Sequence, residues 1–230
     1  MRVRSSARAF ACLLAVSLGG AHGALAAPPA EQPTFSWSGF TVGLDVGYAW
    51  AQASGQDCNW ARTTCPAYST GADGIVGGAY AAFNWQVDHI VVGIEGDIEG
   101  SAVTGTSAFS SPFVSYLFGH AVEENWRASL RARLGYAFDR TLIYVTGGVA
   151  YADVFNNLWR LGKSFHAYGE TRPGWTVGAG VEQALSDHFT ARLEYRYTGF
   201  DSSENSVGTN STILQDLNQQ AIRMGIGYKF

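Results

Sequence analysis

Apolar and polar residues alternate with a period of two along much of this chain. Residues 40–50 place one set of side chains on one face, namely Phe40, Val42, Leu44, Val46, Tyr48 and Trp50. The opposite face carries Thr41, Gly43, Asp45, Gly47 and Ala49. The same alternation runs through residues 90–100, 126–138, 189–197 and 222–230. Strict alternation over this length predicts β-strands with one apolar face and one polar face.

Three Gly-rich segments predict the remaining strands and bring the total to eight: residues 73–86, 141–153 and 173–185. The connections between strands are of two kinds. Short ones lie around Asp88-His89, Asp139-Arg140 and Ser186-Asp187, whereas long polar ones cover residues 51–72, 104–123, 154–172 and 201–218. Because short and long connections alternate and the strand number is even, we expect a closed antiparallel up-and-down meander.

The apolar face of such a barrel points either into a soluble core, as in a lipocalin, or outward into lipid. Strands of ten or more residues are long for a soluble sheet but suit a tilted membrane strand of about 9–11 residues. Aromatic residues stand at both ends of the apolar faces, for example Phe40 and Trp50. The polar faces combine small residues with charges of both signs, which suits a narrow interior. We therefore predict an eight-stranded antiparallel transmembrane β-barrel over residues 27–230.

This orientation places many charged side chains in the lumen. The predicted lumen charges are Glu95, Asp97, Glu99, Arg127, Arg131, Arg133, Glu182, Arg192, Glu194, Arg196 and Arg223, and Asp45 and Lys229 share these faces. The three acids of residues 90–100 should pair across strands with the three arginines of residues 126–138. Such charges can line a pore or form a salt-bridged plug, and we favour the plug because eight strands enclose a space just wide enough for side chains.

The first 26 residues predict a secretory signal peptide, with Arg2, Arg4 and Arg8 before an apolar stretch. Without these three arginines, 12 of the 15 basic residues remain against 19 acidic ones. A net negative chain without a basic cluster argues against nucleic acid as a partner. In a secreted chain, Cys58 and Cys65 predict a disulfide that closes a small loop; a metal site is the alternative.

Catalytic, metal and cofactor motifs are weak, and we predict none of these sites. His120 and His166 are expected in long loops, where they could bind haem or a metal. Asp153, His166 and Glu170 approach the composition found in barrel enzymes that modify lipid A, but no recognisable spacing links them. Solvated loop histidines explain the pair of His120 and His166 more simply.

Several segments resemble a known family. They are WSGFTVGLDVGYAW, GGAYAAFNWQVDHIVVGIEGDIEGS, LRARLGYAFDRTLIYVTGGVAYAD, GWTVGAGVEQALSDHFTARLEYRYTGF and the terminal GIGYKF. They resemble the small outer-membrane proteins of alphaproteobacteria, a porin family of surface antigens with an OmpA-like barrel. Gln183 departs from the pattern, since an aromatic residue is expected on the lipid face there.

The resemblance implies a Gram-negative outer-membrane location, with outer-membrane lipid and lipopolysaccharide as surroundings. It also implies that Tyr228 and Phe230 form a C-terminal signal for the barrel-assembly machinery. We expect a non-enzymatic structural or surface-interaction role with long extracellular loops. A small-solute channel is the alternative, and the sequence identifies no ligand.

Overall fold

The structure is a computed structural model that describes residues 35–59, 67–110, 117–160, 163–207 and 211–230. The predicted signal peptide lies outside these ranges. The described residues belong to one compact unit, and nine strands are found in them. These strands are β1 (Gly39–Asn59), β2 (Ala67–Val87), β3 (Ile90–Ser101), β4 (Thr104–Ser110), β5 (Leu117–Phe138), β6 (Thr141–Arg160), β7 (Lys163–Ala184), β8 (Phe189–Val207) and β9 (Ser211–Lys229).

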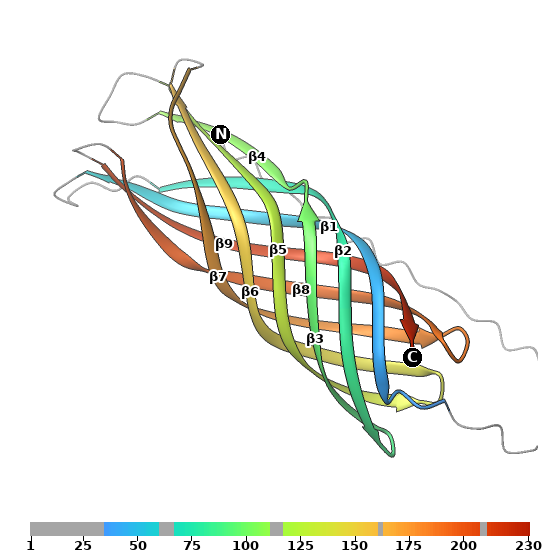
Figure 1. Cartoon of the computed structure of the whole chain (residues 1–230). Coiled ribbons are helices and arrows are strands. Elements are labelled where there is room, and N and C mark those ends of the chain that lie inside the picture. The colour runs from blue at the N-terminus through green and yellow to red at the C-terminus, as the bar shows by residue number, and fades with distance from the viewer. Residues whose placement is uncertain (1–34, 60–66, 111–116, 161–162, 208–210) are drawn as a thin grey trace, which may run out of the picture. The chain divides into compact units, whose positions relative to one another are not determined.

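The strands form one closed antiparallel barrel with eight positions around its circumference (Figure 1). β3 and β4 share one position, because both pair with β2 and with β5. The β1–β9 ladder closes the barrel and runs from Thr41–Lys229 to Asn59–Ser211. No helix in the described ranges is long and apolar enough to cross a membrane.

The three short connections are tight turns at one end of the barrel, which we call the turn end. Asp88 and Asp139 open two of these turns with φ values of 54° and 53°. Aspartate tolerates this left-handed region better than most residues, and it is typical of hairpin turns. The predicted short turns are therefore confirmed.

The predicted long connections are wrong over most of their length. β1 continues to Asn59 and β2 already starts at Ala67, and the other three hairpins extend in the same way. His120 and His166, expected in loops, lie in β5 and β7. The strands continue because their alternation continues with the faces exchanged: Ala53 and Ala72 are buried inside the barrel, whereas Gln52 and Asp73 are exposed outside.

The apolar faces of the strands point outward, as predicted. Leu44 is 70% exposed and Ile226 is 61% exposed. Aromatic side chains border this apolar band at both ends, with Phe138 and Trp85 near the turns and Tyr48 and Trp175 on the other side. Exposed apolar side chains over the whole circumference indicate a surface that faces lipid.

Candidate functional site

Buried acidic and basic side chains occupy the lumen in equal numbers. Among the described residues, seven carboxylates are buried: Asp45, Glu95, Asp97, Glu99, Glu124, Glu182 and Glu194. Seven arginines are also buried: Arg127, Arg131, Arg133, Arg172, Arg192, Arg196 and Arg223. All eleven predicted lumen charges are in this set, which we call the lumenal charge network. Lys229 is only half-buried.

Arg131 lies at the centre of the lumenal charge network. Its guanidinium donates to Glu194 at 2.8 Å and to Asp97 at 3.0 Å, and it also donates to Glu95. It makes a further hydrogen bond of 3.1 Å to Thr146 Oγ1. Because its side chain is inaccessible to solvent, these groups replace its hydration shell.

Other arginines connect the same carboxylates to the surrounding wall. Arg192 donates to Glu95 at 2.9 Å and to Asp45 at 2.8 Å. Arg196 donates to Asp97 at 3.1 Å and to Glu194 at 3.0 Å. These shared acceptors make the pairs one connected set rather than isolated salt bridges.

The lumenal charge network extends in both directions along the barrel axis. Arg133 donates to Glu182 near the turn end. On the far side, Arg223 and Arg127 both donate to Glu99, the latter at 2.6 Å. Arg127 also donates to Gln219.

Two inward tyrosines complete the packing of the arginines. The Arg192 guanidinium lies 3.3 Å from the ring centroid of Tyr80, and the Arg133 guanidinium lies 3.8 Å from that of Tyr144. Both contacts have the geometry of cation–π stacking. We did not predict these tyrosines, although their positions alternate correctly with the outward residues of their Gly-rich strands.

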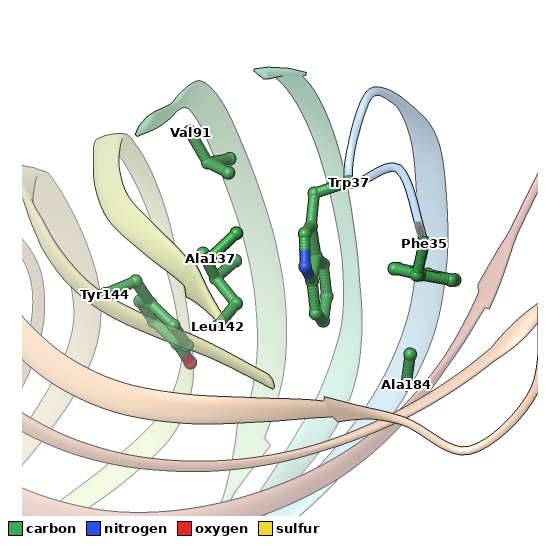
Figure 2. Close-up of a cluster of buried hydrophobic side chains, with 7 residues drawn as sticks. All are labelled: Phe35, Trp37, Val91, Ala137, Leu142, Tyr144 and Ala184. Atoms are coloured by element: carbon green, nitrogen blue, oxygen red, sulfur yellow. The ribbon is translucent and has the colours of Figure 1, made fainter. Parts of the chain in front are cut away.

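Apolar layers cover the lumenal charge network on both sides. At the turn end, Phe35, Trp37, Val91, Ala137, Leu142, Tyr144 and Ala184 form one buried cluster (Figure 2). On the far side, the extended strands contribute two clusters, with Val122, Val154, Phe200 and Leu217 in one and Ala49, Ala72, Val76, Val103 and Ala221 in the other. Most of the charges therefore lie between two apolar layers, while Glu124 and Arg172 lie among the residues of the far layer.

Two of the residues weighed for enzyme chemistry, Asp153 and Glu170, lie on opposite faces of the barrel wall. Asp153 faces outward and accepts a hydrogen bond of 3.0 Å from Asn125. Glu170 belongs to the inward positions of β7 and accepts a 2.6 Å bond from Arg172. Within the described ranges, no group of three His, Cys, Asp or Glu side chains is placed to hold a metal ion.

The structure also locates the remaining predicted residues. Cys58 lies in β1, but its proposed partner Cys65 is outside the described residues. Tyr228 and Phe230 lie on the outward face, with their ring centroids 5.1 Å apart, and Phe230 contacts Phe40 across the closing ladder. Gln183, the unexpected polar residue, accepts a 2.6 Å hydrogen bond from Thr141 on the neighbouring strand.

Related proteins align with most of this chain. It is 36% identical over 208 residues to the 31 kDa outer-membrane immunogenic protein of Brucella melitensis, covering 86% of this chain and 85% of that protein. It is 35% identical over 204 residues to the 25 kDa outer-membrane immunogenic protein of Brucella canis, covering 89% and 84%. The 22 kDa outer membrane protein of Rhizobium leguminosarum is 33% identical over 157 residues, covering 68% and 67%.

Among solved structures, the outer membrane protein OprG of Pseudomonas aeruginosa superposes with a TM-score of 0.54 at 12% identity, covering 84% of this chain and 96% of that one. At this identity the likeness shows the fold alone. The family model described as outer membrane protein beta-barrel domain matches residues 11–230. The chain thus belongs to the outer membrane protein β-barrel domain family, and it is an outer-membrane protein.

Proposed function

We propose that this protein is a non-enzymatic structural barrel whose lumen does not conduct. The observation that carries the proposal is the equality of seven buried carboxylates and seven buried arginines in the described lumen. Most of these groups hydrogen-bond to one another, and Arg172 donates to the half-buried Glu170. An ion that enters such a charge-balanced interior gains little in exchange for its hydration shell. The narrow diameter of an eight-stranded barrel has the same effect, because side chains fill it.

A small-solute channel is the second candidate, since a charged lumen is also what a pore requires. Planar-bilayer recordings of the purified protein distinguish the two. We expect no discrete current steps from the wild type, or from an Arg140→Ala control in which an exposed ion pair is lost. Reproducible steps from the wild type would overturn the proposal. Steps confined to Arg131→Ala would locate the block at the lumenal charge network.

We also propose that the far end of the barrel is exposed at the cell surface. The relatives from Brucella are named as immunogenic outer-membrane proteins. Short turns in the periplasm and longer hairpins outside are the usual arrangement of such barrels. Antibodies against the purified protein should therefore label intact cells. Labelling that requires permeabilised cells would contradict this orientation.

The absence of enzymatic activity is tested separately, through the membrane lipid. Deletion of the gene should leave the mass spectrum of lipid A unchanged. A shift in lipid A mass that the wild-type gene restores would show that an activity has been missed.

Tyr228 and Phe230 remain our proposed contact for the barrel-assembly machinery. Phe230→Asp near the membrane interface should reduce folding stability by only about 0–1 kcal/mol. If the machinery reads this residue, the variant should refold normally in detergent but be scarce in cell membranes. Wild-type amounts in the membrane would contradict the assignment.

A further inference from the structure

The four residues before β1, Phe35 to Ser38, are not part of the barrel wall. They nevertheless fold into its turn end, where Phe35 is 8% and Trp37 only 2% exposed. Gly39 follows with a φ of 126°, in a region of backbone conformation that favours glycine. The chain therefore bends at Gly39, between this segment and the first strand.

Hydrogen bonds tie the segment to the end of β2 and to a turn on the opposite side of the barrel. The Trp37 backbone N–H donates to Gln86 Oε1 at 2.6 Å, and the Gln86 N–H donates to Ser38 Oγ at 2.9 Å. The Trp37 indole Nε1–H donates to the Asp139 carbonyl oxygen at 3.2 Å. Asp139 lies in the β5–β6 turn, and β6 is four positions from β1 in either direction around the barrel. The indole therefore reaches across the mouth of the lumen.

Apolar side chains surround the indole in the mouth. In Figure 2, Trp37 lies between Phe35 on one side and Ala137 and Leu142 on the other, and all four belong to one buried cluster. The Phe35 and Trp37 ring centroids are 4.9 Å apart in an edge-on arrangement. This layer stands between the solution and the lumenal charge network, because Arg133 stacks on Tyr144 at its inner border.

We propose that residues 35–38 form a strap that seals the periplasmic mouth of the lumen, and that its release admits water and small solutes to the lumen from that side only. The strap can leave without breaking any ladder hydrogen bond, because it pairs with no strand. Its release opens a recess whose inner end is the lumenal charge network. The proposal concerns access from one side and does not require the lumen to conduct.

Cysteine accessibility tests the seal directly. The background variant carries Cys58→Ser and Cys65→Ser, which removes the other thiols of the mature chain. The first probe is Thr190→Cys, at an inward position of β8 that is 1% exposed and pairs with Ala184 of the apolar layer. The second probe is Ser129→Cys, which lies further from the turns and level with Asp97 in the lumenal charge network. The reagent is a membrane-impermeant cationic methanethiosulfonate, applied to the folded protein in detergent.

With the strap intact, Thr190→Cys should react slowly, and Ser129→Cys, at a half-buried position, gives the reference rate. Trp37→Ala should raise the rate at Thr190→Cys by about tenfold or more, because the local opening that exposes the thiol becomes easier. The rate at Ser129→Cys should stay unchanged, since the charges above the recess remain in place. Trp37→Phe is the matched control, because it keeps an aromatic ring in the mouth and should preserve protection.

Two results would overturn the proposal: rapid labelling of Thr190→Cys with the strap intact, or no acceleration in Trp37→Ala. Heat-modifiable gel mobility verifies that each variant is folded. If Trp37→Ala does not fold, Gln86→Ala is used in its place. It removes the acceptor of the Trp37 backbone bond and should accelerate labelling by about threefold through easier local opening. An unchanged rate in that variant would also overturn the proposal.

Discussion

Truncation of Arg131 tests whether the lumenal charge network stabilises the barrel. Arg131→Ala removes the cation shared by Glu95, Asp97 and Glu194. Its side chain has no solvent exposure, so water cannot easily replace it. The variant therefore leaves three carboxylates with fewer partners in a closed space.

The size of the loss in unfolding free energy depends on the hydrogen-bond donors that each carboxylate keeps. Glu95 still accepts from Arg192, while Asp97 and Glu194 still accept from Arg196. Removing one partner of a buried ion pair costs about 3–5 kcal/mol. Because partners remain, we expect a loss near the lower bound, about 3 kcal/mol of unfolding free energy.

Urea unfolding in lipid vesicles, followed by tryptophan fluorescence and gel mobility, measures this loss. Arg140→Ala is the matched control, since the side chains of its pair with Asp187 are 41% and 77% exposed. An exposed pair contributes at most about 1 kcal/mol. Combining Arg131→Ala with Glu194→Gln should recover part of the loss, because it removes one of the charges left short of partners. The reasoning is refuted if Arg131→Ala and Arg140→Ala are equally stable.

Three further substitutions test other parts of the barrel. Leu44→Arg, on the outward face at a position 70% exposed, should cost about 2–4 kcal/mol in lipid vesicles, and an unchanged midpoint would argue against membrane contact there. Gly43→Ala should cost about 1–3 kcal/mol because the added Cβ overlaps the Tyr80 ring, whereas Gly71→Ala, with nothing within 4 Å of its Cβ, should stay within about 0.5 kcal/mol. Val154→Asp introduces a charge into the apolar layer of the extended strands; it should make this end sensitive to protease, and full resistance would show that the layer is not needed.

The membrane-spanning part could be predicted because lipid imposes a simple rule on the outward face. With few exceptions such as Gln183, every second residue there is apolar, so the alternation of Leu44 or Ile226 with polar neighbours is visible in the sequence alone. The opposite face is then the lumen, and its charges follow from the same periodicity. That is why the sequence alone predicts charged side chains in the lumen.

The sequence pattern did not predict the extensions of the strands, because beyond the aromatic border the outer face of the barrel meets water instead of lipid. Beyond the aromatic border the outward residues are polar, such as Gln52 and Asp73, and the inward ones are small and apolar, such as Ala53 and Ala72. The alternation with a period of two persists, but small inward residues make it a weak signal, and the polar outward residues indicate loops. A test for alternation itself, whatever the size of the apolar side chains, would detect these extensions.

The strap could not be predicted from a pattern at all. Trp37 and Phe35 lie in a short segment without periodicity, and their burial depends on Gln86 and Asp139, which are 49 and 102 residues away from Trp37. Tyr80 and Tyr144 are a different case. They occupy inward positions of strands that were predicted, so assigning the faces of the Gly-rich segments would have placed them in the lumen.

The choice of ionic partners shows what adjacency in a sheet can and cannot determine. Glu95 and Arg131 are direct neighbours on β3 and β5, and they form a cross-strand pair. Glu182 and Arg192 are equally direct neighbours on β7 and β8, yet Arg192 donates to Glu95 and to Asp45, which is 147 residues away. Arg192 on β8 reaches Glu95 on the opposite wall of the lumen, whereas Asp45 on β1 lies two positions away, beyond β9. Both pairs need the barrel to be closed before they can form. The energy of the lumenal charge network therefore favours the closed barrel over its separate hairpins, because much of it is absent until the last strand pairs with the first.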